Sequence, residues 1–211
     1  MRYHYLAIFF GWAALVLTLW GTFAQYRRAL RLGIEGVSLA TWTLFALMGC
    51  FWIAYGVDRR SVIIALSSLL ILPLQIAIVV RLRPWRSWHS TLVITGATAY
   101  VFVLCVLPTF FWGWPGGVYG AGVVMVISRI PQIVELIRDP DVTGVSVKMW
   151  VMVGASGMCW VIYYENARLW AALASTACAC AASLTNAFLA AWRQRRSRLQ
   201  SVPMRVAFTS S

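Results

Sequence analysis

The sequence of 211 residues is 61% hydrophobic and only 11% charged, with a mean hydropathy of +0.76. Such a chain cannot surround its apolar residues with a water-facing shell, so a soluble globular protein is excluded and a lipid bilayer is the expected solvent. The net charge of +12 does not indicate nucleic-acid binding, because the basic residues are spread over the ends of apolar runs.

Apolar runs of about 20 residues, the length that an α-helix needs to cross the hydrocarbon core, follow one another along the chain. They lack the alternation of barrel strands, and backbone amides in lipid must be bonded within their own segment, so helices are expected. The runs are approximately 5–25, 38–57, 61–82, 91–111, 116–137, 145–164 and 168–192. The predicted fold class is an all-α integral membrane protein with seven transmembrane helices.

The basic residues predict the orientation, because cytoplasmic loops carry an excess of lysine and arginine. With the N-terminus outside, the inner side collects Arg27, Arg28, Arg31, Arg81, Arg83, Arg86, Arg129, Arg138, Lys148, Arg193, Arg195, Arg196, Arg198 and Arg205. Only Arg2, Arg59, Arg60 and Arg168 remain outside. We therefore expect a plasma-membrane protein with a cytoplasmic basic tail, which anionic inner-leaflet lipid attracts.

Two stretches share one pattern, "GTFAQYRRALRLGIEGVS" from Gly21 and "SRIPQIVELIRDPDVTGVS" from Ser128. An offset of 107, which becomes 108 after the loop, pairs Gln25 with Gln132, Gly36 with Gly144, Ser38 with Ser146, Trp42 with Trp150, Trp52 with Trp160, Tyr55 with Tyr163 and Arg60 with Arg168. Each unit holds three helices, which is an odd number of crossings, so two units joined directly would point in opposite directions. One further helix between the units lets both point the same way. This predicts a 3+1+3 arrangement of two parallel repeats. The expected boundaries are 1–86, 87–113, 114–195 and 196–211.

Several other functions are disfavoured by the residues present. The cysteines all fall inside apolar runs, which is typical of small buried hydrophobes rather than disulfides or metal ligands. No His, Asp or Glu lies deep in a run, so an enzyme is not expected, and neither is a cofactor or a metal site. The first run also resembles a signal peptide cut after Ala24, but it ends in the first repeated segment, so we expect it to be retained.

The duplicated pattern identifies a resemblance. Pro-Gln, a basic loop, Gly-Val-Ser, a following Trp and finally Trp-x-x-Tyr, as in "PQIVELIRDPDVTGVSVKMW" and "WVIY", resemble the PQ-loop superfamily. The layout is similar to that of the SWEET sugar transporters, whose bacterial relatives, the SemiSWEETs, carry one unit. The resemblance covers nearly the whole chain. It implies facilitative transport of a mono- or disaccharide by alternating access, and the absence of a deep carboxylate disfavours obligatory proton coupling.

The resemblance implies substrate contacts on the second, third, sixth and seventh helices. Trp52 and Trp160 resemble the aromatic walls on which a sugar ring packs, although interfacial anchoring is an alternative. Sugar carriers have an asparagine sixteen residues after each tryptophan, where this chain has Ser68 and Thr176, flanked by Ser67 and Ser175. Hydroxyl groups offer fewer hydrogen bonds than an amide, and they can also bond to a carbonyl of their own helix.

Pro131 is an expected hinge in the fifth helix, because proline frees a carbonyl and permits a bend. Gln132 would then bond to the exposed backbone, and Gln25 would be its counterpart. Ala24 replaces the first proline, so hinging should be asymmetric. A simple helix end at the membrane surface is the alternative.

Further polar residues lie near the membrane. Arg129 matches Thr22 in the first unit and would either snorkel to the headgroups or contact an anionic substrate. Gln75, Ser183 and Asn186 are explained equally well by bonds between helices. The segments "YGVDRR" and "YYENAR" predict an extracellular gate formed by Tyr55, Asp58, Arg60, Tyr163, Asn166 and Arg168.

Two alternatives to a sugar carrier stay open. One is a PQ-loop carrier of amino acids or organic anions that engages Arg129, Asp139 or Asp141. The other is a non-transporting receptor or trafficking factor, as the distantly similar KDEL receptors are. The sequence also leaves the solute and the formation of a homo-oligomer open.

Overall fold

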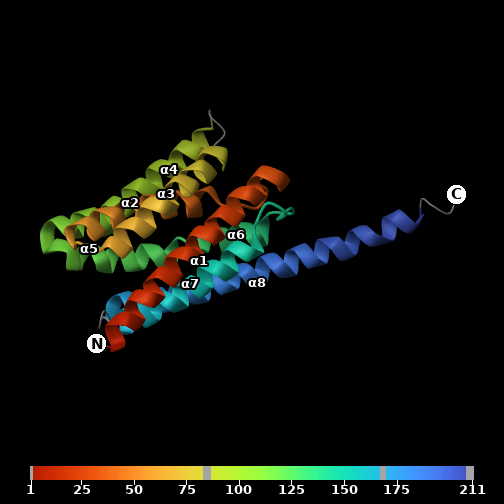
Figure 1. Cartoon of the computed structure of the whole chain (residues 1–211). Helices are drawn as coiled ribbons and strands as arrows, with labels where there is room; N and C mark the ends of the chain where they lie inside the picture. The colour runs from red at the N-terminus through yellow and green to blue at the C-terminus, as the bar shows by residue number, and fades with distance from the viewer. Residues whose placement is uncertain (1, 83–86, 167–169, 208–211) are drawn as a thin grey trace.

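The computed structural model describes residues 2–82, 87–166 and 170–207, and these residues form helices and short loops without a strand (Figure 1). The elements are α1 (Arg2–Leu32), α2 (Leu39–Asp58), α3 (Val62–Leu82), α4 (Trp88–Val101), the π-helical turn η1 (Phe102–Val106), α5 (Leu107–Ile127), α6 (Ile130–Arg138), α7 (Val147–Asn166) and α8 (Trp170–Ala207). The prediction of an all-helical chain is confirmed.

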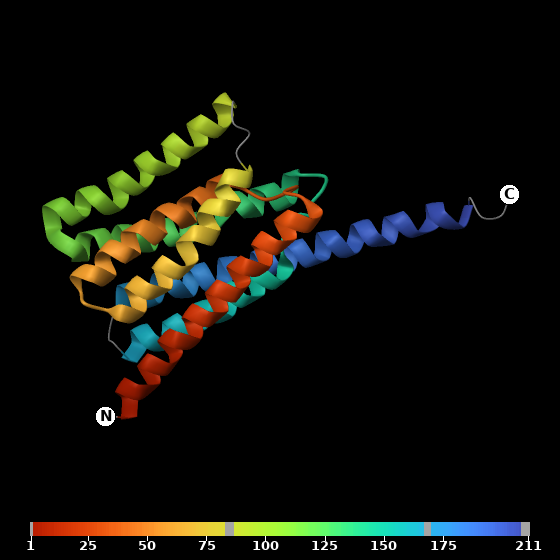
Figure 2. The ribbon, with the colours of Figure 1, turned by 45° about the horizontal axis from the view of Figure 1, so that its top comes forward.

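Five helical stretches in the described part of the chain are long and apolar enough to cross a membrane. They are Tyr5–Leu32, Leu39–Asp58, Val62–Leu82, Trp88–Arg138 and Leu173–Ser197. The fourth has 51 residues, far more than the roughly 20 that one crossing needs. The chain reverses within it, so that α4 lies antiparallel beside α5 (Figure 2).

The reversal occurs at Gly113, whose φ of 69° and ψ of −170° interrupt the helical backbone inside α5. A positive φ is costly for residues with a Cβ and is readily adopted by glycine. Pro115 follows two residues later and cannot donate a backbone hydrogen bond. Local chemistry therefore breaks an otherwise continuous apolar run where the sequence predicts a boundary between two helices.

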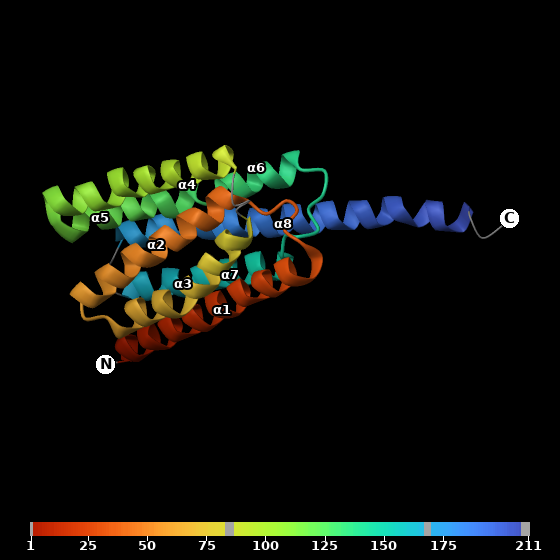
Figure 3. The same ribbon diagram turned by 90° about the horizontal axis from the view of Figure 1, so that it is seen from above.

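Helix α1 lies antiparallel to α7, and the two pack closely along their length (Figure 3). Thr18 and Ser156 share a hydrogen bond of 2.6 Å between their hydroxyl oxygens, and the Ser156 hydroxyl also contacts the Ala14 carbonyl at 2.8 Å. A Cβ at Gly21 would lie 3.2 Å from the Met149 carbonyl oxygen. Small residues and hydroxyl groups thus bring the first helix of the chain against the second half, as is common between helices in lipid.

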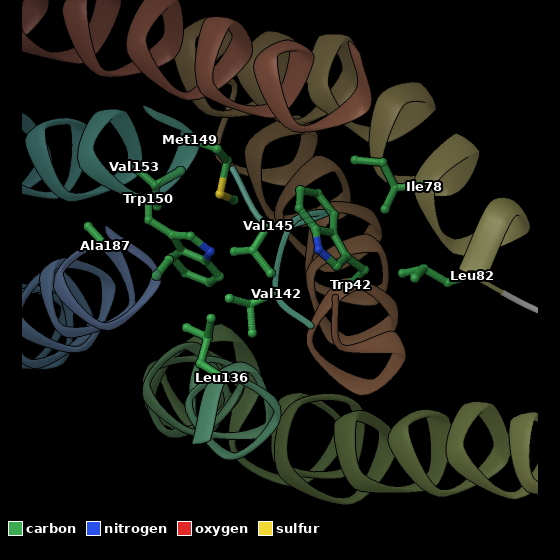
Figure 4. Packing of buried hydrophobic residues seen from close by; sticks show 11 residues of the cluster. Trp42, Ile78, Leu82, Leu136, Val142, Val145, Met149, Trp150, Val153 and Ala187 are labelled. Atoms are coloured by element: carbon green, nitrogen blue, oxygen red, sulfur yellow. The ribbon is translucent and has the colours of Figure 1, made fainter. Parts of the chain in front are cut away.

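Most of the buried hydrophobic residues in the described part of the chain belong to two clusters. One contains Trp42 and Trp150, together with Ile78, Leu82, Leu136, Val142, Val145, Met149, Val153, Ala187 and Ala190 (Figure 4). The other joins α2 to α4, η1 and α5 through Leu44, Met48, Phe51, Ala97, Val101, Cys105, Ala121 and Val124. The expected burial of the cysteines holds for Cys105 and is wrong for Cys50 and Cys178, which are exposed on helix surfaces.

Helix α8 runs without a break through the predicted boundary at residue 196 and extends far beyond the other helices (Figure 1). Its inner part packs against α7, α5 and α6. The expected basic tail thus begins as a continuation of the last helix.

Candidate functional site

The loops 33–38 and 139–146, here called the crossed loops, lie against each other at one end of the bundle (Figure 3). The Gly144 amide donates to the Glu35 carbonyl at 3.2 Å. A Cβ at Gly144 would lie 2.7 Å from the backbone N and O of Glu35, and one at Gly36 would lie 2.9 Å from the Asp141 oxygen. Both glycines of the repeated pattern are therefore required for backbone-to-backbone contact between the two halves of the chain.

The two repeated glutamines hold these loops reciprocally. Gln25 donates from Nε2 to the Gly144 carbonyl at 2.9 Å, and its Oε1 accepts from the Ser146 amide at 2.7 Å. Gln132 donates to the Gly36 carbonyl at 2.6 Å and accepts from the Ser38 amide at 3.0 Å. Each glutamine thus bonds the loop of the other half and not the backbone of its own helix. The prediction that Gln132 bonds to backbone exposed by Pro131 is therefore wrong, because its partners are Gly36 and Ser38 of the other half.

The serines of the repeated pattern begin the next helices. The Ser38 hydroxyl accepts from the Thr41 amide at 3.4 Å, and the Ser146 hydroxyl accepts from the Met149 amide at 3.2 Å. Serine caps satisfy backbone donors that have no partner inside a helix. Glutamine, glycine and serine therefore act together: the glycine permits the crossing, the glutamine fixes it, and the serine starts the helix that follows.

Aromatic side chains close the bundle just inside the crossed loops. Trp42 and Trp150 are each 1% exposed, and Figure 4 shows them on facing sides of Val142 and Val145. The Phe45 ring lies 5.6 Å from that of Trp42 and 6.2 Å from that of Trp150. We call Trp42, Phe45 and Trp150 the aromatic plug.

A cavity of about 170 Å³ lies among α1, α2, α3, α5, α7 and α8, and Phe45 of the plug forms part of its wall. Six residues proposed from the sequence line this cavity, namely Trp52, Ser67, Ser68, Arg129, Trp160 and Thr176. The cavity is of the size that holds one small ring, and smaller than sites for drug-sized ligands.

Ser175 is not among the cavity residues. It instead faces Gly122 of α5, where an added Cβ would lie 2.9 Å from the Ser175 hydroxyl. Ser67 bonds to the Ile64 carbonyl of its own helix at 2.9 Å, which is the alternative that the sequence left open for these hydroxyls. Ser68 and Thr176 have no hydrogen-bond partner among the described residues, so their hydroxyls can serve a ligand.

The two cavity tryptophans belong to aromatic groups on α2 and α7. Trp52 meets Tyr55 edge to face at 5.6 Å, and Trp160 stacks on Tyr164 with 5.6 Å between the rings. Tyr164 also lines the cavity. Both tryptophans therefore line the cavity, whereas an interfacial anchor would face the lipid headgroups.

Among the described residues, the charged and amide members of the predicted gate, Asp58, Arg60 and Asn166, do not bond to one another. Asp58 forms an ion pair with neighbouring Arg59, with 3.8 Å from carboxylate oxygen to Nε. Asn166 donates to the Ile162 carbonyl of its own helix at 2.7 Å. Arg60 adopts a φ of 52° in the turn after α2, and Arg168 lies outside the described residues. Of the predicted gate, Tyr55 and Tyr163 adjoin the aromatic groups of the cavity tryptophans.

Pro131 lies in the first turn of α6, directly after an interruption at Ser128 and Arg129. Its missing N–H costs little there, because the first amides of a helix have no intrahelical partner. The matching helix α1 is continuous past Ala24. The two halves thus differ at this position.

Arg129 turns into the bundle. Its Nε donates to the Ser183 hydroxyl at 2.9 Å, and the Asn186 amide donates to the Arg129 carbonyl at 3.2 Å. The side chain is 8% exposed and forms part of the cavity wall. The Arg129 side chain therefore does not extend to the lipid headgroups, which was one of the two predicted alternatives.

The cavity is also lined by residues that no sequence pattern indicated, namely Thr18, Phe45, Ser156 and Tyr164. Phe45 gives no signal in the sequence because it is one apolar residue within an apolar run. Gln75 does give a signal as an amide in such a run, but only the fold shows that it lines the cavity, with its Oε1 next to Gly49 of α2.

No family model, no curated protein and no solved structure matches this chain.

Proposed function

We propose that this protein is a facilitative carrier that binds a small hydroxylated solute of monosaccharide size in the central cavity and exposes it to one side of the membrane at a time. One observation carries this proposal. The cavity is lined by Trp52 and Trp160, which are matching residues of the two repeats, and by the matching hydroxyl residues Ser68 and Thr176. A pyranose offers an apolar face to an indole ring and hydroxyl groups to serine and threonine.

The same proposal includes a 3+1+3 topology. The reversal at Gly113 supports two crossings within Trp88–Arg138, and α7, with 20 residues, supplies another. With the remaining four stretches this makes seven. The reciprocal bonds of Gln25 and Gln132 support two equivalent units and, with them, a carrier of the PQ-loop type similar to the SWEET transporters.

We further propose that the crossed loops lie in the cytoplasm. The last turns of α1, α3 and α6 end at this side and carry Arg31, Arg81 and Arg138. An excess of such residues is typical of the cytoplasmic side. In this orientation the N-terminus lies outside the cell, and the crossed loops and aromatic plug close the inner exit of the cavity.

Transport in this scheme requires the inner exit to open. The hydrogen bonds of Gln25 and Gln132 then break together with the packing of Trp42, Phe45 and Trp150, while the aromatic groups around Trp52 and Trp160 close over the solute. Such exchange between two closed ends is the essence of alternating access.

The test is counterflow by the purified protein in liposomes preloaded with unlabelled D-glucose, with protein-free liposomes as the blank. We expect labelled D-glucose to accumulate. In Trp160→Ala this accumulation should fall at least about fivefold, because the variant loses one aromatic contact worth about 1 kcal/mol. A wider panel of labelled sugars and amino acids follows if glucose is inactive. If the folded and inserted protein exchanges none of these solutes, the carrier function is wrong and a receptor function is favoured.

A further inference from the structure

The cavity contains one cation, the guanidinium of Arg129, among its described lining residues. This side chain comes from the break between α5 and α6 and is 92% buried, as its exposed fraction is 8%. It lies 5.3 Å over the Phe45 ring of the aromatic plug. The positive charge therefore sits near the closed end of the cavity.

All hydrogen-bond partners of this guanidinium in the described chain are neutral. Nε donates to the Ser183 hydroxyl at 2.9 Å, and Nη1 donates to the Ser128 hydroxyl at 3.2 Å and to the Met125 carbonyl. These bonds use three of the five N–H groups that a guanidinium carries. Within the described residues, the two N–H groups on Nη2 have no partner.

No acidic residue compensates the charge. The cavity lining includes neither aspartate nor glutamate among the described residues. The ion pair found in the described part of the chain joins Asp58 to Arg59, which lie in the turn at the far end of α2. A buried cation without a counter-charge is unfavourable, and an anionic ligand would remove this cost.

A second polar group in the cavity wall is also unused. Gln75 of α3 lines the cavity, and its buried Oε1 has no hydrogen-bond partner in the described structure. The amide nitrogen and oxygen of a glutamine can exchange places by rotation, so this side chain can offer either a donor or an acceptor. The cavity therefore combines an unpaired cation, an adaptable amide, free hydroxyls and indole rings.

We propose that the ligand of this cavity is a small hydroxy acid, such as a sugar acid, whose carboxylate binds the Nη2 side of Arg129. Its hydroxyl groups contact Ser68, Thr176 and Gln75, and its carbon skeleton packs on Trp52 and Trp160. The proposal rests on the carrier function above and narrows its small hydroxylated solute to one that also carries a carboxylate. Arginine suits this role because its planar N–H groups match a carboxylate.

Two matched pairs of probes test the charge of the ligand. D-glucuronate and D-glucose differ by a carboxylate in place of a hydroxymethyl group, as do lactate and 1,2-propanediol. Ligand binding is measured as stabilisation of the purified protein against thermal unfolding, at equal ionic strength, because a ligand that binds only the folded state raises the midpoint. We expect at least one acid to bind about tenfold or more tightly than its neutral partner.

Three variants test whether Arg129 causes the preference for the acid. Arg129→Gln should reduce the acid preference about tenfold or more, and Arg129→Lys should retain part of it because the charge remains. Arg81→Gln removes an exposed arginine at the inner end of α3 and should leave the preference unchanged. If Arg129→Gln does not fold, the wild-type preference and the lysine variant still decide the outcome.

The outcomes separate the ligand class from the carrier function. Glucose counterflow without preference for either acid overturns the anionic ligand and leaves the carrier intact. Binding of an acid without exchange of any solute supports the anionic ligand and overturns the carrier. Stabilisation by chloride equal to that by the acids would identify a halide site and overturn the hydroxy acid.

Discussion

Gln132 and Ser38 lie 94 positions apart in the chain, yet the Ser38 amide donates to the Gln132 side chain at 3.0 Å. Gln25 and Ser146 repeat this relationship at 2.7 Å in the opposite direction. The residues of the repeated sequence pattern thus form reciprocal hydrogen bonds between the two halves of the chain.

The first prediction concerns these bonds. Gln132→Ala leaves the Gly36 carbonyl and the Ser38 amide without their partner, and each unsatisfied buried group costs about 1–3 kcal/mol. We expect lower thermal stability in detergent and faster labelling of a cysteine placed at Thr41, because the inner end opens more often. Gln75→Ala is the matched control, since its Oε1 has no partner, and its stability should change less. Equal losses in both variants would contradict the role of Gln132.

The second prediction concerns the crossing of the loops. A Cβ in Gly144→Ala would lie 2.7 Å from the Glu35 backbone, which forces the crossed loops apart. We expect a lower unfolding midpoint and greater proteolysis of the loops. Gly96→Ala in α4 is the control because an added Cβ meets nothing within 4 Å, and it should gain up to about 1 kcal/mol of helix stability. A Gly144→Ala protein as stable as Gly96→Ala would refute close backbone contact.

The third prediction separates cavity tryptophans from lipid-facing ones. Trp52→Ala and Trp160→Ala should each reduce solute binding by about fivefold or more, since each removes a ring from the cavity. Trp112→Ala removes a side chain that is 72% exposed and should leave binding unchanged. Comparable amounts of folded protein must be verified by gel filtration. Unchanged binding in both cavity variants would indicate that Trp52 and Trp160 are interfacial anchors instead.

The fourth prediction addresses the hinge. Pro131→Ala restores an N–H at the start of α6 and favours continuity with α5 across Ser128 and Arg129. We expect slower counterflow with nearly unchanged solute binding, because a hinge acts on the exchange between states. Identical rates would reduce Pro131 to the start of a helix.

The fifth prediction concerns topology. In intact cells, an impermeant maleimide should label cysteines introduced at Asp58 and Asn166, and it should label those at Arg31 and Arg138 only after permeabilisation. The unmodified chain, with its own cysteines, sets the background. The reverse pattern would place the crossed loops outside and overturn the orientation based on basic residues.

How far the sequence predicts the site depends on how local each signal is. The resemblance to sugar carriers, which have a polar residue sixteen positions after each tryptophan, pointed to Trp52 with Ser68 and to Trp160 with Thr176. All four residues line one cavity. Ser175 differs although it neighbours Thr176, since successive residues of a helix face different directions. Asp58 and Asn166 of the predicted gate were equally visible, but each has a partner in its own segment.

By itself, the sequence determined the solvent, the helical class, the duplication and the special positions of the repeated glutamine, glycine and serine. Hydropathy, backbone preferences and repeat spacing are properties of short segments, which are readable before folding. Only the tertiary structure decided that Gln25 and Gln132 bond the opposite halves, that Phe45 lines the cavity, and that Arg129 faces inward. The partners in these contacts are far apart in the chain, so their choice depends on how the helices pack and on which buried polar groups need a hydrogen bond.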